Sequence, residues 1–359
     1  MFGRRSLVYL LTVLVLVSIA IYLSTRPRKI KVGVLVSISG RNYITGSRMV
    51  GGLEMFKMEN PDANLRIVLK DTRGSSDLCV ELAEELIRKE KVKVLLGETT
   101  SKNTLKLAQI AEKYGIPLLI PRPMTYSFDG YNHVFELAPN ITDVSEVISD
   151  LVEELTERKE KVMFIRDGNS DYSKKLSNLI RSNLEREGYT VDVFEDVPVD
   201  FKDLSDRYSV IVIHRKYSLE MARIIERIRS LGYRGKMIMA STKSRIVRKY
   251  LGECMVGLYA IDYTFRFTEE GGRFSKRYFE LFGTEPYLDS VLMYDSLGYV
   301  DHILRKREKG SLSDVIKRTR YKGVAGYIGD ETDRKLLIEP VKITTTGLEP
   351  LKTHQKVEE

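Results

Sequence analysis

The chain has 359 residues, of which 43% are hydrophobic and 30% are charged, a composition typical of a folded protein of two domains and not of a disordered chain. Its formal net charge is +8, but six basic residues lie before position 32, and without them 52 basic residues almost balance 50 acidic ones. The rest of the chain lacks the positive excess of a nucleic-acid-binding surface, so we expect no nucleic acid as a partner.

Only two cysteines occur, Cys79 and Cys254, which excludes a disulfide scaffold. Both lie in or beside apolar segments, so we expect buried free thiols, with a single bridge as the alternative. Glutamine occurs only twice, whereas Lys, Arg and Glu are abundant. Such a composition is typical of proteins from hot habitats.

An uncharged stretch at 6–24 dominates the N-terminus. A bilayer-crossing helix takes about 17–25 residues, whereas the apolar part of a signal peptide takes about 7–15. We therefore predict an uncleaved membrane anchor within residues 1–29. The small residues Ser18 and Ala20 offer a cleavage site, so a cleaved signal is the alternative.

From position 31 onward, short apolar segments alternate with longer amphipathic ones. The longer segments carry apolar residues at helical spacing, such as Met49, Leu53 and Phe56, and the short ones are rich in β-branched residues. This pattern predicts strands at 31–39, 65–71, 92–97 and 116–121, and helices at 46–60, 76–90 and 101–115. Strands that alternate with helices of this length indicate right-handed βαβ units and a parallel sheet.

Residues 131–143 interrupt the alternation, and a second series then begins. It predicts strands at 161–167, 209–215, 236–241 and 255–261, and helices at 172–188 and 218–232. Two consecutive series imply two sheets. We therefore predict an α/β fold of two Rossmann-like lobes, preceded by the N-terminal transmembrane or signal segment.

No catalytic constellation is present in the sequence. None of the four histidines has metal-ligand spacing to another, and there is no CxxC, Walker A loop or nucleophile elbow. The loop at 39–46 contains two glycines but lacks GxGxxG. We expect neither a metal nor a cofactor and no enzymatic activity, with an enzyme of unrecognised site as a minor alternative.

Four stretches resemble the type I periplasmic binding fold, in particular the leucine/isoleucine/valine-binding proteins of ABC importers. The most specific is VKVLLGETTSKNTLKLAQIAEKYGIPLLIP (92–121), with a strand, a glycine, a hydroxyl-rich loop, a helix, Gly-Ile, a strand and a proline. The weaker ones are VGVLVSISGRNYITG, IVLKDTRGSSD and EPYLDSVLMYDSL. The resemblance runs over about 31–350 and implies a solute-binding protein whose two lobes, joined by crossing strands, close on a small molecule.

The hydroxyl-rich loop has chemistry that suits an anion. Thr99, Thr100 and Ser101 precede a predicted helix, and a helix N-terminus offers free N–H groups and partial positive charge. Ligands of open α/β sheets bind beyond the C-terminal ends of the strands, where this loop lies. Plain N-capping by Ser101 would explain the same residues without a ligand.

The resemblance implies further site residues. Ser101 corresponds to the family's serine for the ligand carboxylate, and Thr125 falls near its threonine after the Pro-containing strand. Tyr172 and Tyr217 correspond to the aromatic residues of the second lobe that close on the ligand. Core or surface packing is the alternative role of both tyrosines.

Two positions depart from the family pattern. The family has an acid for the ligand ammonium where this chain has Thr242, and small residues where this chain has Arg122. Further cations follow other predicted strands, namely Arg166, Arg215 and Lys243. A site without the acid and with extra cations favours an anionic ligand over an amino acid, unless these cations point into solvent.

The resemblance also divides the chain and names its partners. It predicts lobe one at 30–139 plus 262–335, and lobe two with the C-terminal tail at 140–261 plus 336–359. We expect a small-molecule ligand, an ABC permease, membrane attachment through the N-terminal segment and a monomeric body.

The location follows from the resemblance as well. We expect the extracytoplasmic face of the cell membrane, or secretion after cleavage, although more basic residues follow the apolar stretch than precede it. The extracellular sensing domain of a signalling system is the main alternative. A repressor core of similar fold is disfavoured because an apolar segment stands where a helix-turn-helix would lie.

Overall fold

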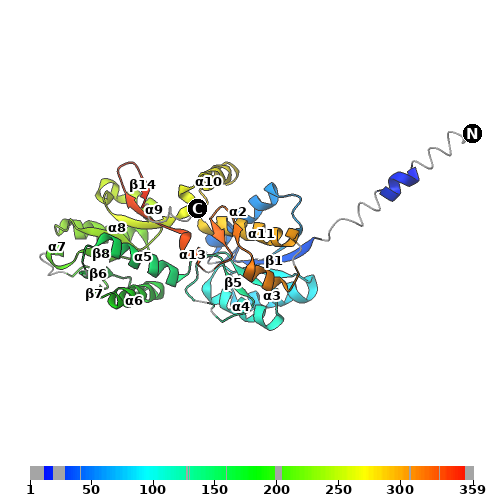
Figure 1. Cartoon of the computed structure of the whole chain (residues 1–359), viewed down its shortest axis with the longest axis horizontal. Helices are drawn as coiled ribbons and strands as arrows, with labels where there is room; N and C mark the ends of the chain where they lie inside the picture. The colour runs from blue at the N-terminus through cyan, green and yellow to red at the C-terminus, as the bar shows by residue number, and fades with distance from the viewer. Residues whose placement is uncertain are drawn as a thin grey trace, which may run out of the picture.

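The computed structural model describes residues 12–18, 29–40, 42–126, 128, 130–158, 160–198, 204–306, 309–330 and 332–351. Two lobes lie side by side along the long axis of the molecule (Figure 1). Residues 12–18 are helical, and no helix of the described residues is long and apolar enough to cross a membrane. Most of the anchor predicted at 6–24 lies outside the described residues, so the anchor stays a prediction.

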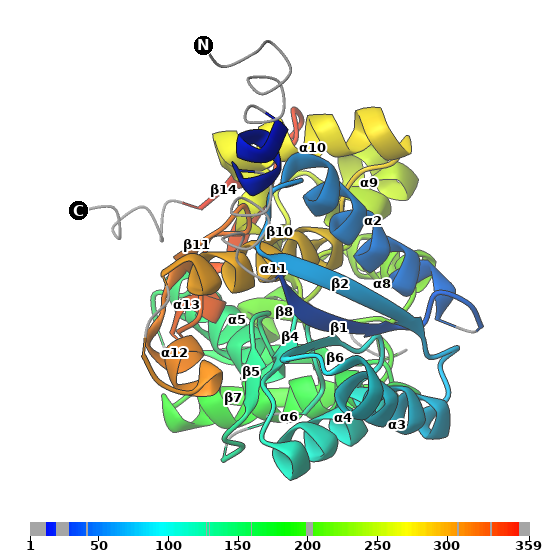
Figure 2. The same cartoon turned by 90° about the vertical axis from the view of Figure 1, so that its right-hand side faces the viewer.

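Lobe one is built on a five-stranded sheet in the order β2-β1-β3-β4-β5, and all its strands are parallel. Its strands are β1 (Ile30–Val36), β2 (Leu65–Asp71), β3 (Val94–Gly97), β4 (Leu118–Ile120) and β5 (Val134–Glu136). The helices between them are α2 (Tyr43–Glu59), α3 (Ser76–Glu85) with η1 (Leu86–Glu90), and α4 (Ser101–Tyr114). Figure 2 shows α2 on one face of the sheet and α3 with α4 on the other.

Lobe two is built on a seven-stranded sheet in the order β14-β13-β10-β9-β8-β6-β7. The parallel part comprises β6 (Lys161–Ile165), β7 (Thr190–Phe194), β8 (Val210–Ile213), β9 (Lys236–Met239) and β10 (Tyr259–Tyr263). The antiparallel edge comprises β13 (Ile338–Ile343) and β14 (Leu348–Pro350). The helices are α5 (Ile141–Leu155), α6 (Asp171–Arg186), α7 (Leu204–Arg207), α8 (Ser218–Ser230), α9 (Ser244–Leu251) and η2 (Gly252–Met255).

The central strands of both sheets, such as β3, β4 and β8, are buried on both faces, which is why they appear as continuous apolar runs in the sequence. In β1, Val32, Val34 and Val36 belong to the core beneath α2, whereas Leu35 belongs to the core beneath α3 and α4. Side chains that alternate in this way contribute to two cores at once. The second lobe repeats the arrangement with two further cores.

The chain returns from lobe two to lobe one after β10. The returning elements are η3 (Thr264–Phe267), α10 (Glu269–Phe282), α11 (Leu288–Lys306), α12 (Leu312–Arg318), the hairpin β11 (Tyr321–Lys322) and β12 (Tyr327–Ile328), and α13 (Asp333–Leu336). Helix α11 packs on α2 so closely that a Cβ added at Gly52 would lie 1.9 Å from the Ser290 carbonyl oxygen. Glycine is therefore required at this crossing despite its low helix propensity.

The chain thus crosses between the lobes three times, after β5, after β10 and after α13. These crossings support the two-lobed architecture, while the boundaries predicted at 139/140, 261/262 and 335/336 stay predictions. Two crossings meet in a buried ion-pair cluster, in which Arg334 lies 3.3 Å from Glu136 and 3.2 Å from Asp143. Burial nevertheless raises the pKa of Glu136 to about 7.

The two cysteines differ in their surroundings. Both are free thiols, but only Cys79 in α3 is buried, whereas Cys254 in η2 is exposed. The prediction of two buried thiols is therefore wrong for Cys254. Its neighbour Met255 faces the core of lobe two instead, because a single 3-10 turn buries only one of these two side chains.

Candidate functional site

The loops beyond the C-terminal ends of the strands bring the two lobes into contact. The Lys175 ammonium, in the first turns of α6, donates a hydrogen bond of 3.1 Å to the Thr125 carbonyl in the loop after β4. The same ammonium lies 5.3 Å from the centre of the Tyr126 ring. Residues of these loops in the two lobes therefore face one another, as expected for a ligand site beyond the strand ends.

In lobe one, Ser101 and Thr125 are adjacent. Thr100 and not Ser101 is the N-cap of α4, because the Thr100 hydroxyl accepts from the Asn103 N–H at 3.3 Å. The proposed capping role of Ser101 is therefore wrong. Its hydroxyl instead lies 3.3 Å from the Thr125 hydroxyl and accepts from the Thr125 N–H at 3.2 Å.

A buried carboxylate fixes the loop that carries these hydroxyls. Glu98 accepts hydrogen bonds from the Ser37 hydroxyl at 2.9 Å, the Thr72 hydroxyl at 2.5 Å and the Thr100 N–H at 2.8 Å. Buried carboxylates need such partners to offset the loss of hydration. Glu98 thus holds Thr100 and the start of α4 in place from within lobe one.

Arg122 lies against the same loop. One of its terminal nitrogens donates to the Thr99 carbonyl at 2.5 Å, and its Nε is buried with no hydrogen-bond partner among the described residues. A guanidinium N–H without a partner is uncommon, because losing both water and a partner is costly. Arg122 therefore places a cationic side chain against the Thr99 carbonyl, two residues before Ser101 in the chain.

In lobe two, aromatic side chains from different elements come together near Tyr172. The Tyr172 and His214 rings lie 5.3 Å apart, and Tyr263 at the end of β10 shares a hydrogen bond with Thr242. Burial raises the pKa of Tyr172, with a contribution from nearby Tyr263, and it raises the pKa of Tyr263 to about 12. Both phenols are therefore neutral at physiological pH.

His214 is a buried and neutral member of this group. Burial and the nearby Lys243 ammonium lower its pKa to about 4. Its Nδ1 lies 2.9 Å from the Ser173 hydroxyl, which fixes the ring behind Tyr172. His214 thus contributes a packed ring and no charge at neutral pH.

Of the predicted residues, the structure brings together Ser101 and Thr125 in lobe one. Tyr172 lies in the first turn of α6, where it packs against His214 and a hydrophobic core of lobe two, so its role in ligand closure stays a prediction. Thr242 is connected to Tyr172 through Tyr263.

Tyr217 lies elsewhere. It precedes α8, its side chain makes no cap, and it is 58% exposed. It lines a cavity of about 420 Å³ together with Asp167, Asn169 and Arg215, all within lobe two. Among the described residues no contact joins Tyr217 to Tyr172 or to Thr125, so its role in ligand closure stays a prediction.

The remaining predicted cations gather at the strand ends of lobe two. Arg166 lies 3.1 Å from Glu195, and Arg215 donates to the Glu195 carbonyl. The Nε atoms of both arginines are buried and unpartnered among the described residues. Lys243 donates to the Lys216 carbonyl, and burial together with Lys216 lowers the pKa of Lys243.

The sequence reasoning missed Tyr263 and Lys175. Tyr263 lies two residues beyond the strand predicted at 255–261, whereas in the structure it is the last residue of β10. Lys175 is one of two adjacent lysines on an amphipathic helix, and nothing in its local sequence distinguishes it from a solvated lysine. In the part of the chain that the structure describes, no group of acids, histidines and cysteines could hold a metal ion.

The two α/β lobes, the triple crossing and the facing loops define a two-lobed binding protein. A family model described as "Periplasmic binding protein" matches residues 29–345. The chain therefore belongs to the periplasmic binding protein family, which confirms the resemblance and implies a location outside the cytoplasm. The members are binding proteins and not enzymes. A search of curated protein sequences found no match.

Solved structures of similar fold include three solute-binding proteins. A leucine-binding protein of Thermotoga maritima is 22% identical, with a TM-score of 0.66 over 90% of this chain and 97% of that chain. A branched-chain amino acid transporter binding protein of Streptococcus pneumoniae, solved with isoleucine, is 20% identical, with a TM-score of 0.65 over 90% and 99%.

The third is an ABC transporter solute-binding protein of Rhodopseudomonas palustris, solved with 3,4-dihydroxybenzoic acid. It is 17% identical, with a TM-score of 0.68 over 90% of this chain and 96% of that chain. At these identities the likenesses show a shared fold, and they leave the ligand of this chain open.

Proposed function

We propose that the chain captures a small carboxylate-bearing solute between its two lobes and delivers it to an ABC permease. The observation that carries this proposal is the Arg122 guanidinium, which lies against the Thr99 carbonyl beside the Thr99–Ser101 loop at the start of α4. A carboxylate placed there would gain charge-assisted hydrogen bonds from the guanidinium and the helix N-terminus. Lobe two would close over it with Tyr172, Tyr263 and Thr242.

The same geometry disfavours a ligand ammonium. Thr242 shares its hydrogen bond with Tyr263, and Glu98 is fully engaged within lobe one. An ammonium without a carboxylate partner would lose hydration with no replacement. Carboxylates without an ammonium do bind this fold, because the R. palustris protein was solved with 3,4-dihydroxybenzoic acid. We infer that this chain prefers an acid such as a 2-oxo acid over the amino acid.

Calorimetric titration with leucine, with its 2-oxo analogue 4-methyl-2-oxopentanoate and with 3,4-dihydroxybenzoate tests the proposal. We expect an acid without the ammonium to bind more tightly than leucine. Loss of the hydroxyl in Ser101→Ala should weaken binding about fivefold, and Arg122→Ala about 10- to 100-fold, since charge-assisted bonds are the stronger ones.

Lys249→Ala removes an exposed cation of α9 in lobe two and serves as the control that leaves affinity unchanged. Circular dichroism of each variant confirms that it is folded. Tighter binding of leucine, together with an Arg122→Ala variant of unchanged affinity, would contradict the proposal and assign the site to amino acids.

We further propose that residues 6–24 tether the protein to the membrane. The full chain should then stay with the membrane fraction after a high-salt wash. Recovery in the soluble fraction with an N-terminus near Ile21 would show a cleaved signal instead. Permease subunits that co-purify with the full chain would support import, whereas a co-purifying kinase or chemoreceptor would indicate sensing.

A further inference from the structure

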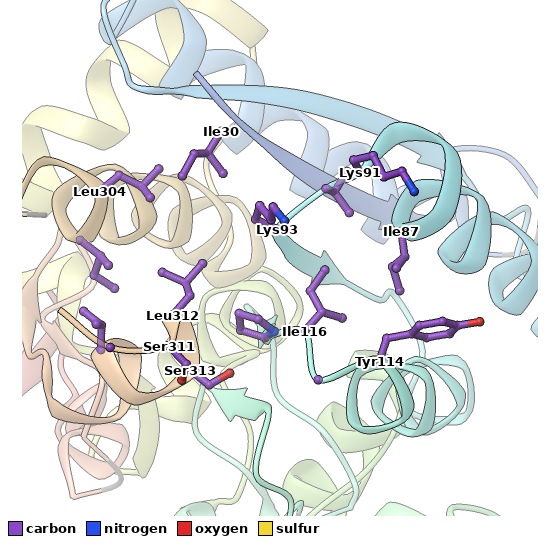
Figure 3. Close-up of a pocket in the computed structure, with 16 residues that line it drawn as sticks. Ile30, Ile87, Lys91, Lys93, Tyr114, Ile116, Leu304, Ser311, Leu312 and Ser313 are labelled. Carbon is purple, nitrogen blue, oxygen red and sulfur yellow. The ribbon is translucent and has the colours of Figure 1, made fainter. Parts of the chain in front are cut away.

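A groove of about 630 Å³ lies at the end of lobe one where its strands begin (Figure 3). Ile30 is the first residue of β1, Lys93 directly precedes β3, and Pro117 directly precedes β4. Ser101 and Thr125 follow the opposite ends of β3 and β4. The groove and the proposed ligand site therefore lie at opposite edges of one parallel sheet.

The walls of the groove are apolar. Figure 3 shows Leu304 and Leu312 on one side and Ile87 and Ile116 on the other, with Lys93 between them. Ile30, Ile87, Leu304 and Leu312 are only partly buried, so apolar surface remains open to an occupant. An apolar groove that is left open on a folded protein marks an interaction surface.

The charge at the groove has one sign. Its sixteen lining residues include Lys91 and Lys93 and no acidic residue. Both lysines are exposed, and neither forms an ion pair among the described residues. Lys31, which follows Ile30, is instead paired with Glu90 at 2.9 Å. This combination of apolar walls and lysines complements an anionic amphiphile.

The start of the fold places the groove near the membrane. Ile30 lines the groove, and only residues 25–29 separate it from the apolar stretch at 6–24. A connection of this length spans at most about 20 Å, even fully extended. If residues 6–24 are the membrane tether of the proposed function, the groove cannot lie farther than this from the bilayer surface.

We propose that this groove rests on the membrane and binds anionic phospholipid, with head groups at Lys91 and Lys93 and acyl chains against the apolar walls. Lobe one then stands on the bilayer, and the proposed ligand site at the opposite edge of its sheet points away from the lipid. The inference rests on the tether and is independent of which solute is bound.

The test uses the full chain reconstituted in vesicles of phosphatidylcholine, with and without phosphatidylglycerol. A fluorophore is placed at the groove in a Cys254→Ser/Leu312→Cys variant. In the unsubstituted chain the same fluorophore on exposed Cys254 reports on lobe two, since Cys79 is buried. We measure flotation with the vesicles, quenching by lipids brominated in their acyl chains and quenching by aqueous iodide.

In phosphatidylglycerol vesicles, we expect brominated lipid to quench the groove label at least twofold more than the Cys254 label. We also expect the groove label to be protected from iodide at least twofold more than the Cys254 label. Lys91→Glu/Lys93→Glu should abolish this protection without changing flotation. Lys249→Glu/Lys276→Glu makes the same charge change at exposed positions away from the groove. In this control variant, the groove label should remain protected from iodide.

A chain that floats but exposes both labels equally would overturn the lipid groove and leave the tether standing. Equal loss of protection in the two charge-reversed variants would overturn the groove as well, because it would show a general charge effect. A chain that floats with neither vesicle would overturn the groove and the tether together, and the solute titration would still decide the ligand site.

Discussion

Gly97 shows how a single residue shapes the proposed ligand site. It ends β3 with a φ of +141°, and a Cβ added to it would lie 2.1 Å from the Leu35 carbonyl oxygen on the neighbouring strand. An L side chain rarely adopts this backbone conformation. Close backbone packing here directs the chain into the Glu98–Ser101 loop.

Gly97→Ala should therefore lower the free energy of unfolding by about 3 kcal/mol or more, through backbone strain and the clash with β1. Urea unfolding followed by circular dichroism measures the change. Gly272→Ala is the matched control, because Gly272 lies in α10 with open space around it and should gain up to about 1 kcal/mol from helix propensity. Similar stabilities of the two variants would contradict the packing argument.

Sequence-based predictions agree best with the structure where the local conformation depends on neighbouring residues in the chain. The hydroxyls at 99–101 marked the start of α4 because such residues cap helices, but the sequence suggested Ser101 as the N-cap where the structure has Thr100. The choice depends on the extended backbone of Thr100, with φ −123° and ψ 145°. The role of Arg122 at the ligand site stays a prediction, and its bond to the Thr99 carbonyl depends on the fold of the loop.

At the scale of elements, α11 illustrates a buried carboxyl group that organises a turn. Asp295 is fully buried and accepts the N–H groups of Val324 and Ala325, at 2.8 and 2.7 Å, in the turn between β11 and β12. Burial raises the pKa of Asp295 to about 7 in spite of these bonds.

This pKa makes stability depend on pH. Between about pH 4 and pH 7 the folded chain keeps a proton on Asp295 that the unfolded chain has released, so its contribution to stability falls as pH rises and levels off above pH 7. Asp295→Asn should lower Tm overall, because one backbone N–H loses its acceptor, but it should flatten the decline in Tm from pH 5 to pH 8.

Thermal unfolding of both proteins across this range measures the effect. Asp314→Asn is the control, because the pKa of Asp314 is lowered by its bond to Ser311 and its titration lies below the range. An unchanged slope in Asp295→Asn would show that Asp295 is not the titrating group.

The elements themselves were predicted unevenly. Long periodic helices such as α6 and α8 and the apolar strands of the parallel sheets follow directly from the sequence pattern. Short β7 and the antiparallel edge strands β13 and β14 were not predicted, because charged residues or prolines interrupt their short apolar runs. Contacts such as that of Lys175 with Thr125 depend on how two lobes meet, which no local pattern contains.

At the scale of the whole molecule, three crossings and the cluster of Arg334, Glu136 and Asp143 form the connection about which the lobes can rotate. A solute that contacts both lobes stabilises the closed arrangement and not the open one. Its binding therefore shifts the equilibrium from the open form to the closed form. We expect the radius of gyration in small-angle X-ray scattering to decrease at saturating solute.

The Ser101→Ala variant at the same solute concentration should show a smaller decrease, because a lower fraction is bound. A radius of gyration that stays constant at saturation, confirmed by calorimetry, would indicate a rigid sensor rather than a closing binding protein.

The pairing of α2 with α11 also has a consequence for how the protein is made. Asn64, just after α2, donates its N–H to Asp301 at 2.6 Å, and the two residues are 237 positions apart in the chain. At about 5–20 residues per second, a ribosome needs on the order of ten to fifty seconds to make that interval. During this time lobe one has no partner for the apolar face of α2 and cannot complete its core. This delay favours a protein that must pass through a membrane before it folds. Its first hundred residues cannot complete their core until the last quarter of the chain has been synthesised.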